Sequence, residues 1–186
     1  MGTSITQGSS RNSNSWQAAV AAMRDERVPI DRVVREIWRA ARRDEEANWL
    51  QMLQAPLIDT CRSIAEQSGT AIEALGAANS TIAAASDITF ATEIAKRALV
   101  KSFQFEDRSQ GFVEAVFAEA TNYLLSRDLA GLIGSSSRCA TISDAARFKS
   151  EVLSAVRSDV REVLGDTAEW SVMIDRTLQH LARRRS

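Results

Sequence analysis

Residues 30–43 read IDRVVREIWRAARR, and this segment carries two distinct faces of a helix. At 100° per residue, the apolar side chains fall on one side and the arginines on the other. The apolar side holds Ile30, Val33, Val34, Ile37, Trp38 and Ala41, and the basic side holds Arg32, Arg35, Arg39, Arg42 and Arg43. The pattern predicts a helix that packs by one face and offers the other to water or to anions.

Similar periodicity extends over most of the chain on both sides of this segment. Only two prolines and eight glycines interrupt the 186 residues, and no segment alternates apolar and polar residues as a half-buried strand would. Helices are expected near 16–24, 30–43, 45–54, 57–68, 88–103, 109–126, 144–164 and 167–182. We therefore predict an all-α fold, a multi-helix bundle of roughly seven to nine helices.

The sequence also predicts details of individual helices in this bundle. Thr70–Ala85 is rich in small residues, which predicts one or two short helices buried between others and broken near Asn79 and Ser80. The most apolar segment begins at Ser109 and is expected to form the central helix, followed by a short helix or tight turn over Arg127–Ile133. Ser143 is expected to cap the long helix that follows.

The chain divides into two parts by composition. Residues 1–14 are mostly Ser, Thr, Asn and Gly, which cannot offset the entropy of ordering, so we expect a flexible N-terminal arm. Residues 15–186 are long enough to form a single helical domain with its own core. We expect the arm to become ordered, if at all, on a partner or on a second copy of the chain.

Charge and cysteine content exclude several classes of protein. A net charge of -1 produces no long-range field that would concentrate nucleic acid or acidic substrates. Cys61 and Cys139 form no CxxC pair and are expected to be buried thiols in a reducing cytosol. Residues 1–10 lack the features of a secretory signal, and the uncharged run Ala74–Ser86 is too short for a bilayer. These features predict a cytoplasmic protein with no membrane partner.

No familiar catalytic or metal-binding pattern is present. His180 is the sole histidine, and Glu114 and Glu119 are five residues apart and do not share a helix face. A helical bundle that binds metal through Glu-x-x-His would need that motif twice, and the chain has no GxxxxGK[ST] motif for nucleotide phosphates. We therefore expect no enzyme activity, no cofactor and no metal.

A remote alternative comes from Arg176 and His180, which share one helix face. This pair resembles the arginine and histidine of the all-helical HEPN ribonucleases. Their motif separates the two residues by about four to six positions, whereas three lie between them in RTLQH. The resemblance implies a ribonuclease that would use these two side chains.

The basic face of residues 30–43 remains as the candidate interaction site: Arg32, Arg35, Arg39, Arg42 and Arg43. Each guanidinium group is a fork suited to bidentate contact with a carboxylate or a phosphate. The alternatives are an ordinary solvated face, which the interspersed Asp31 and Glu36 would suit, and a nucleic-acid-binding module. Neutral overall charge and few aromatic residues favour a protein partner over nucleic acid.

The opening MGTS, followed by GS, NS and Trp16, resembles the starts of small accessory proteins encoded in bacterial antiphage defence operons. The resemblance covers about the first sixteen residues and implies a non-catalytic partner of a larger enzyme or ATPase. Together with the lack of a catalytic set, it predicts an accessory or adaptor subunit of a prokaryotic multiprotein system that acts through protein-protein contacts.

Overall fold

The computed structural model describes residues 14–43, 58–83, 90–164 and 176–181. Every regular element in these ranges is an α-helix, which confirms the predicted all-α bundle. The helices are α1 (Asn14–Arg24), α2 (Ile30–Arg43), α4 (Ile58–Gln67), α5 (Ala71–Ala83), α6 (Phe90–Ser102), α7 (Arg108–Leu132) and α8 (Ile142–Leu164). Residues 176–181 are also helical. None of the described helices has both the length and the apolar content that crossing a bilayer requires.

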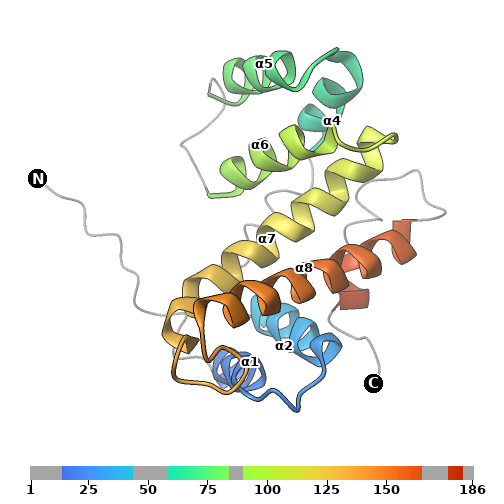
Figure 1. The fold of residues 1–186 in the computed structure, drawn as a ribbon. Coiled ribbons are helices and arrows are strands. Elements are labelled where there is room, and N and C mark those ends of the chain that lie inside the picture. The colour runs from blue at the N-terminus through green and yellow to red at the C-terminus, as the bar shows by residue number, and fades with distance from the viewer. Residues whose placement is uncertain (1–13, 44–57, 84–89, 165–175, 182–186) are drawn as a thin grey trace, which may run out of the picture.

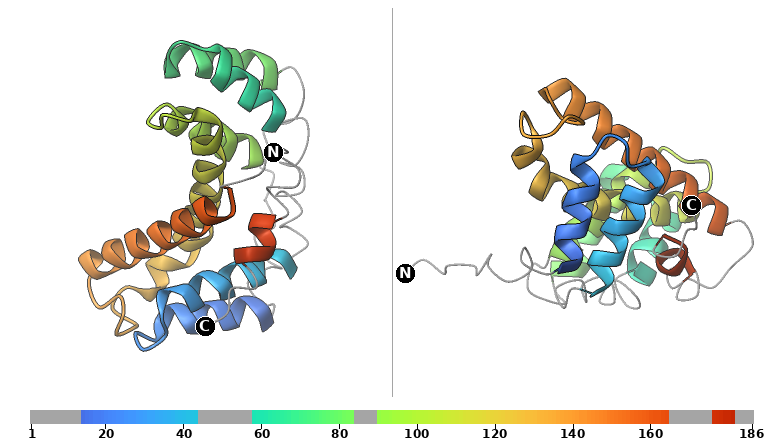
Figure 2. Two further views of the ribbon diagram at one scale, coloured as in Figure 1. Left: turned by 90° about the vertical axis from the view of Figure 1, so that its right-hand side faces the viewer. Right: turned by 90° about the horizontal axis from the view of Figure 1, so that it is seen from below.

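Helix α7 runs through the middle of the molecule and connects its two ends (Figure 1). Helices α6 and α8 pack directly on α7, and α4 also contacts it. At one end α1 and α2 form an antiparallel pair whose α2 rests on α8, and at the other end α5 lies beyond α6 (Figure 2). The buried apolar side chains of all these helices form one continuous cluster.

The prediction of a central helix is confirmed by the burial of α7. All eleven residues from Gly111 to Thr121 are buried, so neighbours cover every side of this part of the helix. Phe105 packs so close to Gly111 that a Cβ atom there would lie 2.5 Å from the phenyl ring. The helix begins one residue before Ser109, because the side chain of Asp107 caps it by accepting a hydrogen bond from the Gln110 amide at 3.0 Å.

The expected break near Arg127 is wrong, because α7 continues to Leu132, which is buried. The turn comes at Gly134, whose φ of 72° lies in the left-handed region that glycine tolerates best. The cap of α8 also differs from the expected Ser143. The hydroxyl of Thr141 accepts the Asp144 amide at 3.1 Å while the Asp144 carboxylate accepts the Thr141 amide at 3.1 Å, which is a reciprocal capping box.

Helix α5 differs most from the sequence-based expectation, since it is one unbroken helix at the outside of the molecule (Figure 1). Its only fully buried apolar side chains among those described are Ala74 and Ala78, and Ile72 is 85% exposed. The helix continues through Ser80 and Thr81, where a break was expected, and their hydroxyls donate to the carbonyl oxygens four residues earlier at 3.1 and 2.9 Å. The small residues of α5 therefore form a narrow buried strip against its neighbours, and the helix is not enclosed by them.

The apolar face predicted for α2 is confirmed. Pro29 precedes the helix, and its carbonyl oxygen accepts the Arg32 and Val33 amides at 3.0 and 3.1 Å. The apolar face is buried except for Ile30, which is half-buried; its buried members are Val33, Val34, Ile37, Trp38 and Ala41. The indole of Trp38 packs on the ring of Phe117 in α7 at a centroid distance of 5.4 Å.

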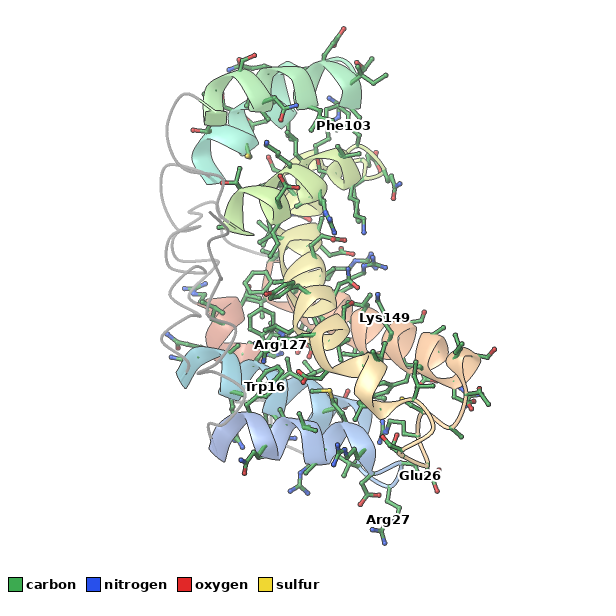
Figure 3. The ribbon with its side chains drawn as sticks, turned by 90° about the vertical axis from the view of Figure 1, so that its left-hand side faces the viewer. Trp16, Glu26, Arg27, Phe103, Arg127 and Lys149 are labelled. Atoms are coloured by element: carbon green, nitrogen blue, oxygen red, sulfur yellow. The ribbon has the colours of Figure 1, made fainter. Side chains whose placement is uncertain are left out.

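Polar contacts join the α1–α2 pair to the end of α7. The Trp16 indole donates to the Asp128 carboxylate at 3.0 Å, and the Arg127 guanidinium stacks on the Trp16 ring at 4.1 Å (Figure 3). In the loop after α7, Arg138 donates to the carbonyl oxygens of Asp25 and Val28, the first of them at 2.6 Å. These contacts satisfy carbonyl groups between α1 and α2 and hold the pair in a fixed orientation.

Several expectations concern residues outside the described ranges. They are the flexible arm before residue 14, the helix at 45–54, the first two residues of the helix at 88–103 and the first part of the helix at 167–182. Within the described ranges, Cys61 and Cys139 are buried free thiols, as predicted.

The burial of Ile37 generates a test of the α2 packing. Ile37→Asp should destabilise the protein by about 3–5 kcal/mol or prevent folding, because it buries a carboxylate among apolar side chains. The matched control is Ile72→Asp, the same chemical change at a site that is 85% exposed, and it should shift stability by less than about 0.5 kcal/mol. Chemical denaturation followed by circular dichroism measures both. Equal losses in the two variants would contradict this placement of α2.

Candidate functional site

The basic face of α2 is only partly available to a partner. Arg32, Arg39 and Arg42 are exposed, as predicted. Arg35 is half-buried and its Nε atom is enclosed, so this side chain belongs partly to the packing of the helix. The side chain of Arg43 lies outside the described residues.

The exposed arginines also differ in their neighbours on the helix. Arg39 donates to the Glu36 carboxylate at 3.3 Å, one turn earlier. This pair is at the surface, so water screens it and its contribution to stability is small. A partner carboxylate can compete with Glu36 for Arg39, but Arg32 and Arg42 are the better positions for a clean test of binding. We call Arg32, Arg39 and Arg42 the basic surface of α2.

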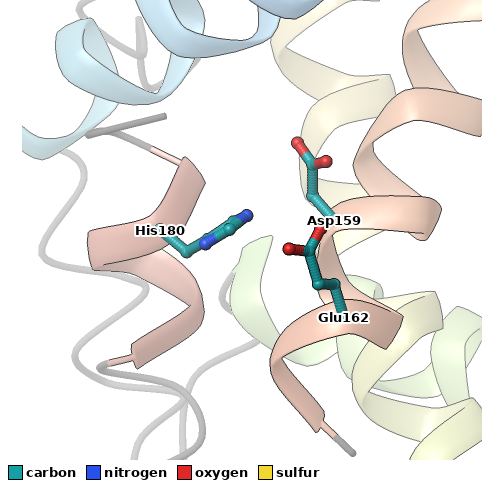
Figure 4. A group of neighbouring side chains, drawn as sticks. All are labelled: Asp159, Glu162 and His180. Atoms are coloured by element: carbon teal, nitrogen blue, oxygen red, sulfur yellow. The ribbon is translucent and has the colours of Figure 1, made fainter. Parts of the chain in front are cut away.

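A second cluster lies between α8 and the helical residues 176–181. Asp159 and Glu162 project from α8, and the imidazole of His180 points toward them (Figure 4). One side-chain oxygen or nitrogen from each residue lies within 4.8 Å of the other two. Asp159 is 1% exposed, Glu162 is exposed and His180 is half-buried, with its Nε2 atom enclosed and making no hydrogen bond. The cluster is therefore buried at Asp159 and open to solvent at Glu162.

The sequence contains one signal of this cluster. Asp159 and Glu162 are three residues apart, a spacing that places both on one face of α8. No such rule predicts the approach of His180. A simple hairpin turning near Gly165 would bring His180 opposite the middle of α8, not opposite the last turns that carry the two carboxylates.

The position of His180 also bears on the resemblance to HEPN ribonucleases. Arg176 is exposed, whereas His180 faces two carboxylates. Negative charges beside the imidazole would repel a phosphate group. The geometry therefore favours a role of His180 with cations over a role with RNA.

The two buried glutamates of α7 are used within the fold. Arg161 of α8 donates twice to Glu114, at 2.6 and 2.9 Å, and this bidentate contact raises the pKa of the Arg161 guanidinium. Lys101 of α6 donates to Glu119. The two carboxylates thus face different helices, and they do not form a pair for acid and base catalysis.

Neither cysteine is suited to nucleophilic chemistry. Burial raises the pKa of the Cys61 thiol to about 11, and burial also raises the pKa of Cys139. A catalytic thiol needs the opposite shift, because the thiolate is the nucleophile. Both thiols are therefore structural.

The chain matches no protein-family model, no curated protein and no solved structure.

The raised pKa of Cys61 generates a test of burial. A shift from 9.0 to about 11 leaves roughly 100-fold less thiolate at pH 8 than in the unfolded chain. Native protein should therefore react with a disulfide reagent at least that much more slowly at this site than protein unfolded in guanidinium. The Cys61→Ala and Cys139→Ala variants assign the two rates.

A matched control places a thiol at the surface. Ile142 is 75% exposed at the start of α8, so Ile142→Cys should react rapidly in the native state. Equally fast reaction of Cys61 and of the added thiol would show that Cys61 is accessible.

Proposed function

We propose that the chain is a non-catalytic accessory subunit that binds an acidic surface of a protein partner through the basic surface of α2. The observation that carries this proposal is the contrast between the two faces of one helix. Arg32 and Arg42 are exposed, while Ile37, about 140° from each of them around the helix, and Trp38 are fully buried. The arginines therefore extend from a helix that the protein core holds in place.

A rigid helix makes binding by arginine more favourable. The backbone loses little freedom on association, because the packing of α2 on α1 and α8 has already fixed it. Each guanidinium can form two parallel hydrogen bonds to one carboxylate. Arg32 and Arg42 lie ten residues apart, about 15 Å along a helix, so they can contact separate acidic residues of a partner.

Charge and aromatic content favour a protein partner over nucleic acid. The net charge of -1 gives no field that would attract a polyanion from a distance. Proteins that bind single strands stack bases on exposed aromatic rings. Among the side chains whose burial the structure describes, Tyr123 of α7, at 41% exposure, is the one exposed large aromatic residue, and it lies on a different helix from the basic surface.

The setting that we propose is a prokaryotic multiprotein system in the cytoplasm. The support for antiphage defence is the resemblance of the opening MGTS and the following Ser-rich residues to accessory proteins of such operons. In this setting the larger partner performs the chemistry, and the present chain supplies a rigid helical surface.

Charge reversal tests the proposal. Arg32→Glu with Arg42→Glu should leave the melting temperature nearly unchanged, since each exposed change alters stability by less than about 0.5 kcal/mol. The same pair should abolish partner binding through repulsion and lost contacts. Affinity purification of native complexes, with quantitative mass spectrometry, compares the variant with wild type.

The control variant has the same change in net charge, placed outside the basic surface of α2. Arg97→Glu with Arg147→Glu alters α6 and α8 at two exposed positions, and the surface ion pairs of Arg147 contribute little. This variant should retain the partner. Identical partner lists for all three proteins would show that the basic surface is an ordinary solvated face.

A mobility-shift assay at low and moderate salt tests the nucleic-acid alternative. Binding that weakens steeply with salt and disappears in the α2 reversal alone would assign the basic surface to nucleic acid. We expect no shift at low salt.

A further inference from the structure

Asp159, Glu162 and His180 form a set of side chains whose chemistry the basic surface of α2 does not explain. Two carboxylates and one imidazole converge from two separate helical segments. We propose that these three side chains bind one divalent transition-metal ion, and that zinc fits the set best. The site would fasten residues 176–181 to α8.

The geometry is close to that of a three-ligand metal site. The ligand atoms lie within 4.8 Å of one another. Atoms bound to one zinc ion at about 2.1 Å are roughly 3.4 Å apart in tetrahedral geometry. Small side-chain rotations of Glu162 and His180, which are not fully buried, can close the difference.

The helical spacing supports a shared ligand position. Asp159 and Glu162 are three residues apart on α8, so both carboxylates reach the same side of the helix. His180 approaches that side from the C-terminal segment (Figure 4). A cation at this point would be bound from two helical segments, α8 and residues 176–181. A group of acidic residues on a single helix would bind it from one side only.

Burial distinguishes the cluster from an ordinary group of surface acids. Asp159 is 1% exposed and provides a ligand from the dry side of the site. Glu162 is exposed, so an ion can enter from solvent and keep one or more water ligands there. The enclosed Nε2 of His180 makes no hydrogen bond, and a neutral imidazole nitrogen is a good ligand for a transition metal.

The mixture of donors selects the class of ion. Magnesium and calcium prefer sites built entirely from oxygen, whereas an imidazole nitrogen favours zinc, copper, iron or nickel. The lack of a cysteine ligand disfavours the softest ions, such as Cu(I). For a given site of nitrogen and oxygen ligands, zinc binds more tightly than manganese or ferrous iron.

Metal binding would also have a structural effect. Leu178 and Leu181 are buried, so residues 176–181 already pack against the rest of the molecule by an apolar side. A bound ion would add a second attachment at His180. Binding to the native state alone would raise the melting temperature in proportion to the free-energy gain at the metal concentration used.

Calorimetry with zinc alone tests the proposal on the full-length protein after treatment with a chelator and dialysis. Wild type should bind one zinc ion per chain and melt at a higher temperature with zinc present. Glu162→Gln and His180→Gln should each weaken binding by about tenfold or more, since loss of even an outer neighbour of a metal typically costs that much. Circular dichroism checks that both variants remain folded, and Asp159→Asn provides a third ligand substitution of nearly equal size.

The matched control is Glu151→Gln, which removes an exposed carboxylate from the same helix but outside the cluster. It should bind zinc as wild type does. Cobalt(II) provides an independent readout, because ligation by oxygen and nitrogen gives visible bands without the intense near-ultraviolet absorption of a cobalt–thiolate bond. Magnesium in place of zinc should bind far more weakly.

Three results would each overturn the inference. One is the absence of saturable zinc binding by folded wild type. Another is binding that Glu162→Gln and His180→Gln leave unchanged. The last is a thiolate band with cobalt, which would move the metal to Cys61 or Cys139.

Discussion

The enclosure of α7 between Gly111 and Thr121 is the constraint on which the rest of the structure depends. A helix surrounded by neighbours must satisfy any charge that it carries, because a carboxylate without a partner in a low-dielectric interior is strongly disfavoured. Glu114 and Glu119 are 3% and 5% exposed. Arg161 from α8 and Lys101 from α6 supply the opposite charges, with the Arg161 contact bidentate. The two ion pairs therefore join α8 and α6 to the buried part of α7.

Such ion pairs add less to net stability than the attraction between their charges suggests. Removing water from two charges offsets most of the attraction between them, whereas removing one partner leaves a buried charge and costs about 3–5 kcal/mol. The cations lie partly in solvent, with side-chain exposures of 64% for Arg161 and 43% for Lys101. This exposure lowers both the cost of removing water from the charges and the attraction between them. Arg157, one turn before Arg161 on α8, also lies 3.8 Å from the Glu114 carboxylate, so α8 presents two cations to this buried charge.

The two proposed sites depend on this framework in different ways. The basic surface of α2 needs only a rigid support, and α1, α8 and the ring of Phe117 provide it. The Asp159–Glu162–His180 cluster needs the C-terminal segment to lie beside the last turns of α8. Loss of metal binding would therefore leave the α2 proposal untouched, and loss of partner binding would say nothing against the metal site.

Local chemistry in the sequence determined the helices and the two faces of α2. Periodic apolar residues specify a helix and its buried side through interactions between positions three and four apart, so the sequence by itself assigns Ile37 and Trp38 to the core. The N-terminal cap of α8 was mispredicted because neighbouring residues compete for this position, and Thr141 caps the helix where Ser143 was expected. Tertiary structure alone decided the position of α5 at the outside, the partial burial of Arg35, and the approach of His180 to Asp159 and Glu162. These features depend on where distant helices pack, and no spacing along the chain encodes that packing because side chains far apart in sequence meet only after the core has formed.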